Sequence, residues 1–167
     1  MAIVADLHMH STNSFDGKNS MYEMCAAAVK LGMKHVCFTE HYDFNPTSRS
    51  YRFFVREKYN QDIEQCREAF GDSLEILTGI EFGEPHKYPA EFEKVHDAGF
   101  DVVLGAVHRI GDVPVAVAAA TDMPAEEIFQ RYYEEVLAAV KLGGFDVLAH
   151  MDLPKRHVGS SRAFPSI

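Results

Sequence analysis

Short apolar runs alternate along the chain with stretches in which apolar residues recur at helical spacing. The apolar runs cover residues 2–8, 35–39, 74–80, 100–107 and 145–149, and their length is typical of buried strands. The stretches between them predict helices over residues 20–33, 53–70, 89–98 and 124–143. This alternation predicts an α/β fold with about five parallel strands joined by right-handed crossovers.

Local sequence features place the ends of these helices. Ser20 and Glu23 match the S-x-x-E capping box, which predicts a helix start at this point. Glycines near residues 32, 71 and 143 predict the helix ends. In the last helix, helical spacing predicts one apolar face made of Ile128, Tyr132, Val136 and Val140.

Every predicted strand ends in a side chain that is able to bind a metal ion. These side chains are His8, His10, His41, Glu81, His108 and His150. The carboxyl ends of parallel strands meet at one edge of a sheet or barrel, so residues far apart in sequence are expected to converge there. His8 and His10 lie two apart on a strand and therefore point to the same side, with Met9 on the other.

The chemistry of these residues predicts a metal centre. Imidazole with carboxylate suits zinc, iron or manganese, and Glu81 is able to bridge two ions. A single histidine is more often a packing or surface residue than a ligand. Five strand ends agree here, however, and burying so many imidazoles without a metal would leave many polar groups to satisfy.

Other polar residues near the strand ends have two interpretations each. Asp16, in "SFDG", is either a further ligand or a turn residue before Gly17. Glu40, Asp43 and Glu84 either orient the ligands by hydrogen bonds or lie in solvated loops. The pair Lys155-Arg156 follows His150, and the arginine is either solvated or a clamp for a phosphate group.

Composition limits the class of protein. The 167 residues are 47% hydrophobic and 25% charged, which predicts a single domain over residues 1–167. No apolar run reaches the roughly 18 residues of a membrane span, and the start lacks a signal-peptide pattern, so we expect a cytoplasmic protein. The net charge of −9 argues against a nucleic-acid partner. Cys25, Cys37 and Cys66 form no metal or disulfide pattern and are expected to be apolar fillers.

Six segments taken in order resemble the polymerase-and-histidinol-phosphatase (PHP) superfamily of metal-dependent phosphoesterases, over essentially the whole chain. The segments are "DLHMHS", "SFDG", "TEHYDF", "GIEFGE", "GAVHRI" and "VLAHMDLPKR". The stretch from "SFDG" to "TEHYDF" and the ending "HMDLPKR" are most similar to the histidinol-phosphatase branch. The resemblance implies a distorted (β/α)7 barrel that carries up to three divalent ions (Zn, Mn or Fe).

The resemblance also implies a role for individual residues. His8 and His10 would bind one ion, Glu81 would bridge it to a second held by His108 and His150, and Asp16 with His41 would begin a third. Arg156 matches a position expected to contact substrate phosphate, with Arg109 as a second donor. Glu81, His108 and Arg156 are then the expected catalytic residues.

The chain departs from the family pattern after its fifth predicted strand. Family members continue with further strands and a late D-x-H motif, whereas the D-x-H of this chain, Asp6-Leu7-His8, belongs to the first motif. The barrel is therefore expected to be C-terminally incomplete, with open edges. Two interpretations remain: a piece of a longer protein, or a short relative that covers its edges by forming a homo-oligomer.

The expected activity is hydrolysis of a small phosphate monoester, with L-histidinol phosphate of histidine biosynthesis as the favoured substrate. The ions would acidify a water and neutralise the phosphoryl oxygens. Three alternatives stay open: a PHP phosphoesterase acting on nucleotides, a non-catalytic metal-binding protein, and an amidohydrolase-like enzyme, which the "TEH" and "GIE" strand ends fit less well.

Overall fold

A parallel sheet of five strands is the centre of the fold. The computed structural model describes residues 4–158, without the side chain of His96. The strands are β1 (Ala5–Met9), β2 (His35–Tyr42), β3 (Glu75–Gly83), β4 (Val102–Ala106) and β7 (Val147–Leu148). They follow one another in the order β1-β2-β3-β4-β7, and every neighbouring pair is parallel. The predicted α/β class and its five parallel strands are confirmed.

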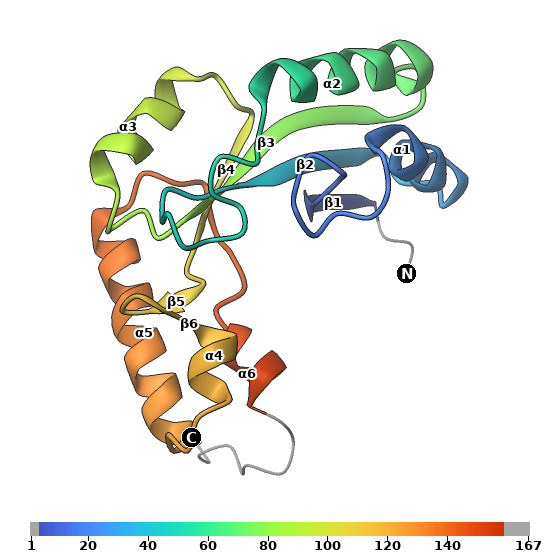
Figure 1. Cartoon of the computed structure of the whole chain (residues 1–167). Coiled ribbons are helices and arrows are strands. Elements are labelled where there is room, and N and C mark those ends of the chain that lie inside the picture. Colours follow the sequence, from blue (N-terminus) through green and yellow to red (C-terminus); the bar gives the residue numbers. More distant parts are fainter. Residues whose placement is uncertain (1–3, 159–167) are drawn as a thin grey trace.

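Three helices cover the outer face of this sheet (Figure 1). They are α1 (Met21–Lys30), α2 (Arg56–Phe70) and α3 (Pro89–Asp97). The predicted capping box is present at α1, where Ser20 and Glu23 bond reciprocally. Buried side chains such as Phe38, Tyr59 and Ile80 fill the space between helices and strands. The three cysteines are free and buried, as predicted.

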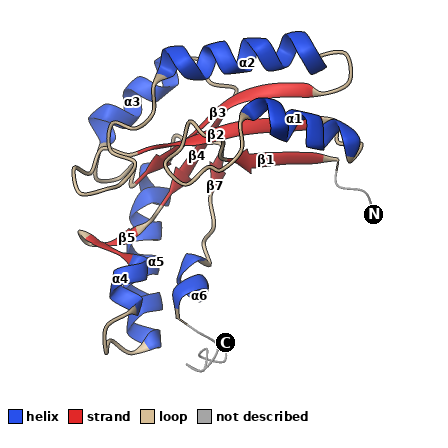
Figure 2. Ribbon diagram, turned by 45° about the vertical axis from the view of Figure 1, so that its right-hand side comes forward, coloured by secondary structure: helices blue, strands red, loops and turns tan. Residues whose placement is uncertain are grey.

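A second group of helices lies beyond the carboxyl ends of β4 and β7 (Figure 2). It contains the hairpin β5 (Arg109–Ile110) and β6 (Val113–Pro114), then α4 (Val115–Ala119), α5 (Ala125–Leu142) and α6 (Leu153–His157). These elements share their own apolar core. The hairpin, α4 and α6 were not predicted. On α5, Ile128, Tyr132 and Val136 are buried as predicted, but Val140 is 48% exposed and Ala139 is buried in its place.

Several boundaries differ from the predictions. β2 and β3 each run about three residues further, so His41 and Glu81 lie inside the strands. α2 begins at Arg56, because Val55 still has an extended backbone. Residues 2 and 3 of the first predicted strand, and the tail 159–167, lie outside the described residues. No helix in the described part of the chain is long and apolar enough to cross a membrane.

Candidate metal centre

β1 carries His8, and His10 follows directly after its last residue, Met9. Asp6 pairs with Val36, and Met9 pairs with Phe38, so the ladder is irregular between Asp6 and Met9. Met9 packs against the core beneath α1 and α2. His8 and His10 therefore lie on the opposite, concave side, as the H-x-H spacing predicted.

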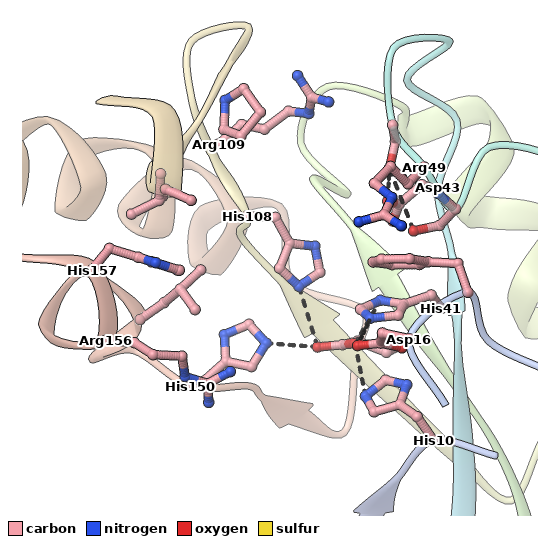
Figure 3. A pocket seen from close by; sticks show the side chains of 18 of the residues that line it. His10, Asp16, His41, Asp43, Arg49, His108, Arg109, His150, Arg156 and His157 are labelled. Atoms are coloured by element: carbon pink, nitrogen blue, oxygen red, sulfur yellow. Dashed lines mark hydrogen bonds and ion pairs between the residues drawn. The ribbon is translucent and has the colours of Figure 1, made fainter. Parts of the chain in front are cut away.

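The carboxylate of Glu81 is the centre of a cluster of five histidines, four of which are labelled in Figure 3: His10, His41, His108 and His150. Glu81 is fully buried, and its side chain comes from the middle strand of the sheet. Oε1 lies 2.6 Å from His150 Nε2, 3.3 Å from His8 Nε2 and 3.4 Å from His108 Nε2. Oε2 lies 2.9 Å from His41 Nδ1 and 3.4 Å from His10 Nε2. The structure thus brings all the predicted strand-end residues together.

Burial and the mutual contacts of the cluster shift the pKa values of its side chains. Complete burial would raise the pKa of Glu81, but the surrounding histidines hold it well below its usual value. Burial lowers the pKa of His10 to about 4, so this imidazole is neutral at neutral pH. Burial also opposes protonation of His41, yet its contacts with Asp16 and Glu81 raise its pKa to about 10. The two carboxylates therefore favour positive charge at this position.

The donor set fits divalent cations. Buried His150 Nδ1 has no hydrogen-bond partner in the described cluster, and buried His41 Nδ1 and Glu81 Oε2 meet as an ion pair at 2.9 Å without hydrogen-bond geometry. Unpaired buried polar atoms are costly, and cations bound by imidazole and carboxylate would relieve part of that cost. Donor atoms gather within 4.8 Å of one another in three sets: His8 with His10 and Glu81, His10 with Asp16 and His41, and His41 with Glu81 and His108.

A loop between β1 and α1 holds the histidines through Ser14, which sequence reasoning missed. The Ser14 hydroxyl donates to Glu40 Oε2 at 2.5 Å and accepts from the backbone N–H of His41 at 2.9 Å. His10 Nδ1 lies 3.3 Å from the same oxygen. Because the serine proton is used by Glu40, His10 Nδ1 is the donor in this contact. Its Nε2 is then unprotonated and free to bind a metal ion.

Glu40, Asp43 and Glu84, which the sequence left as either ligand-orienting or solvated, accept hydrogen bonds from backbone and loop groups. Buried Glu40 accepts from the backbone N–H and the hydroxyl of Ser11. Buried Glu84 accepts from the backbone N–H of His108 at 2.6 Å. Asp43 accepts from the hydroxyl of Ser48 at 2.5 Å. Burial raises the pKa of both Glu40 and Glu84. Glu40 and Glu84 therefore do not lie in solvent. They orient, through backbone N–H groups, the segments that carry His10 and His108.

The cluster forms the floor of a cavity of about 750 Å³. Arg156 lines it from α6, on the same side of the cluster as His150 (Figure 3). Arg109 also lines the cavity, although one guanidinium nitrogen donates to the backbone oxygen of Asp112. On the opposite wall, Arg49 lies over the ring of Phe15, which in turn contacts His41. A cavity with a metal-binding floor and cationic walls suits a phosphorylated ligand.

Comparison with known proteins gives consistent results. A family model described as "PHP domain" matches residues 6–165. A probable histidinol-phosphatase of Thermotoga maritima is 29% identical over 91% of this chain and 56% of its own length. A probable histidinol-phosphatase of Deinococcus radiodurans is 30% identical over 93% of this chain and 63% of its own length. The chain therefore spans less than two thirds of these relatives.

A solved structure has the same fold over the matched part. The histidinol phosphate phosphatase of Lactococcus lactis, crystallised with zinc, L-histidinol and phosphate, matches with a TM-score of 0.84 and 28% identity. The match covers 91% of this chain and 59% of that one. The fold of the matched part is thus shared with a protein that binds zinc, an amino alcohol and phosphate.

Proposed function

Because this chain belongs to the PHP domain family, we propose that it is a metal-dependent phosphoesterase that hydrolyses a small phosphate monoester. The observation that carries the proposal is the ring of five imidazoles around buried Glu81, on the floor of a cavity lined by Arg156. L-Histidinol phosphate is the proposed substrate and histidine biosynthesis the proposed pathway. The names of the relatives and the ligands of the Lactococcus lactis structure support this choice.

The residues that would hold the ions are those of the cluster. We propose up to three divalent ions (Zn, Mn or Fe), with ligands from His8, His10, Asp16, His41, Glu81, His108 and His150. Bound there, the ions would supply an acidified water and neutralise charge on the phosphoryl oxygens. Glu81 would act as the shared ligand, because both of its oxygens face histidine nitrogens.

The chain itself would bind and orient the phosphate. Arg156 is proposed as the main donor, since its planar guanidinium is able to hold two phosphoryl oxygens at once. Arg109 is a second donor, with the nitrogens that Asp112 does not occupy. The cavity walls would exclude bulk water from the reacting group, which strengthens each of these electrostatic contacts.

Phosphate release is the decisive measurement. The 167-residue chain, loaded with zinc or manganese, is assayed with L-histidinol phosphate beside EDTA-treated protein. His108→Ala removes one proposed ligand, and His35→Ala serves as its control, because His35 pairs with Glu75 at the other end of β2. We expect metal-dependent turnover in the wild type and in His35→Ala, and at least a 100-fold loss in His108→Ala.

Other results of this assay would favour one of the alternative functions. Turnover of a nucleotide in preference to L-histidinol phosphate would identify a different phosphoesterase. Tight metal binding by a folded chain with no hydrolysis of any phosphate would contradict the proposed activity and favour a non-catalytic metal-binding protein.

We also propose that the open sheet edges are covered by a second copy of the chain. The outer strands β1 and β7 expose Leu7 (41%) and Val147 (45%). Unpaired edges of this kind are usually protected from further pairing. Light scattering on the purified chain tests this proposal, and a monomer at micromolar concentration would rule it out.

A further inference from the structure

A buried tyrosine of α5 lies beneath the ends of two ligand-bearing strands. Tyr132 is completely buried. Its hydroxyl lies 3.2 Å from the backbone oxygen of Val107 and 3.1 Å from the backbone oxygen of His150. Val107 directly precedes His108, so both carbonyl groups belong to the segments that carry ligands of the second proposed ion. One phenol thus contacts both segments at once.

The direct pairing between these two segments is short. β4 and β7 share two residue pairs, Leu104 with Val147 and Gly105 with Leu148. One more backbone bond, from Ala149 N–H to the oxygen of Gly105, follows. Beyond this point the chains diverge into the β5–β6 hairpin and α6. The Tyr132 hydroxyl therefore holds the segments together where the ladder has ended.

The backbone of His150 needs such support. Its φ is +25°, a region that residues other than glycine rarely adopt. Conformations of this kind persist where the surrounding structure holds them in place, and they gather at functional sites. The conformation brings the imidazole within 2.6 Å of Glu81. The Tyr132 phenol carries one proton, so its hydroxyl donates to one of the two carbonyl oxygens and lies within hydrogen-bonding distance of the other.

We propose that Tyr132 is a positioning residue for the metal centre. Its hydroxyl fixes the ends of β4 and β7 at the separation that lets His108 and His150 reach the same oxygen of Glu81. Removing the hydroxyl would leave the apolar core of α5 intact but weaken binding of the ion that these two histidines share. This inference rests on the proposed function only for its catalytic consequence, because metal affinity is measured separately.

The chain contains a matched control. Tyr59 of α2 is also completely buried, and its hydroxyl lies 2.8 Å from the oxygen of Phe38 and 3.2 Å from that of Gly79. It therefore also bridges two neighbouring strands, β2 and β3. These strands, however, pair continuously from His35 to Tyr42, and neither bridged residue is adjacent to a proposed ligand. Loss of this hydroxyl should affect stability alone.

The experiment compares Tyr132→Phe with Tyr59→Phe. For each variant we would measure the zinc stoichiometry, the zinc dissociation constants by competition with a chelating dye, and the thermal unfolding of the metal-free form. Both substitutions should lower the Tm of the metal-free protein. Tyr132→Phe should in addition weaken one class of zinc site by about tenfold, as loss of a residue that orients a ligand does, while Tyr59→Phe keeps wild-type zinc affinity.

A double-mutant cycle tests whether Tyr132 acts through His150. In a His150→Ala background the further change Tyr132→Phe should have little additional effect on zinc affinity, because the ligand it positions is already gone. Wild-type zinc affinity in Tyr132→Phe, equal losses in both tyrosine variants, or fully additive effects in the cycle would each overturn the proposal. If the wild-type chain binds zinc but hydrolyses no phosphate, the proposed function fails while these affinities still decide the role of Tyr132.

Discussion

The Nδ1 atom of His10 lies 3.3 Å from the hydroxyl oxygen of Ser14, four residues further along the same loop. The same hydroxyl also bonds Glu40 and the backbone of His41, so one small side chain contacts segments of two strands. His10, one of the proposed metal ligands, and the second strand are thereby held in one arrangement. Ser14 is the natural first target for testing how the centre is organised.

Ser14→Ala should weaken zinc binding by about tenfold, because His10 loses the partner that fixes its tautomer. The dissociation constant is measured by competition with a chelating dye. Ser20→Ala is the control: it removes a helix cap at a cost of about 1 kcal/mol in stability, but it lies outside the metal centre. Equal zinc affinity in Ser14→Ala and wild type would contradict the assigned role of this hydroxyl.

Metal should stabilise the folded chain. A ligand at 100 times its dissociation constant adds about 2.7 kcal/mol to the free energy of unfolding, which corresponds to a rise in Tm of about 5–10 °C for a chain of this size. Calorimetry with zinc or manganese, before and after EDTA, measures the shift. Glu81→Gln should abolish most of it, since the shared ligand loses its charge. An unchanged Tm on metal addition would argue against a centre built from these residues.

Arg156→Gln should raise the KM for L-histidinol phosphate and lower kcat/KM by about 10–100-fold, the loss expected for one charge-assisted hydrogen-bond donor. Zinc stoichiometry should not change, because Arg156 is not a ligand. Lys155→Gln is the matched control: it removes the same charge from the neighbouring position of α6, and Lys155 does not line the cavity. A similar effect of both variants would point to a general loss of positive charge.

Glu135, which lies outside the candidate metal centre, should make the folding stability of the chain depend on pH in the acid range. Partial burial opposes its ionisation, but contacts with His86, the backbone of Gly111 and Lys87 lower its pKa below the usual value. The Glu135 carboxyl group therefore binds a proton more weakly in the folded state than in the unfolded state. Its stabilising effect is complete above the ordinary glutamate pKa of about 4.3 and is lost as the pH falls through the lowered value.

The test compares Glu135→Gln with wild type by urea unfolding at pH 7, 5 and 3.5. At pH 7 the variant should be less stable by about 1.5–3 kcal/mol, the value of a hydrogen bond to a charged group, and the difference should shrink at pH 3.5. Glu134→Gln, an exposed neighbour on α5, should show no such trend. A difference that stays constant with pH would show that the charge of Glu135 is not responsible.

The parts of the structure that follow from regular spacing could be predicted from the sequence. His8, His108 and His150 lie near strand ends, and the geometry of a parallel sheet alone brings strand ends together. The burial of Glu81 among them follows from its position on the middle strand. The α5 prediction failed at Val140, where the helix turns Ala139 toward the core instead, because the period of an α-helix does not match a strict four-residue repeat.

Other features depend on contacts that no local pattern records. Ser14 acquires its role from Glu40, which is 26 residues away in sequence. The β5–β6 hairpin has two residues in each strand, too few for any periodicity, although Gly111-Asp112 between Ile110 and Val113 is a known hairpin turn pair. Tyr132 was predicted on the apolar face of its helix, but the two carbonyl groups at its hydroxyl could not be anticipated.

The spread of the ligands along the chain, from residue 8 to residue 150, has a consequence for folding kinetics. The proposed ligands lie in or just beyond all five strands of the sheet, so a partly folded chain that lacks either outer strand would hold an incomplete set. Metal uptake would then be a late event that follows the pairing of β1 with β2 and of β7 with β4. Bound metal would accordingly slow unfolding far more than it would accelerate folding.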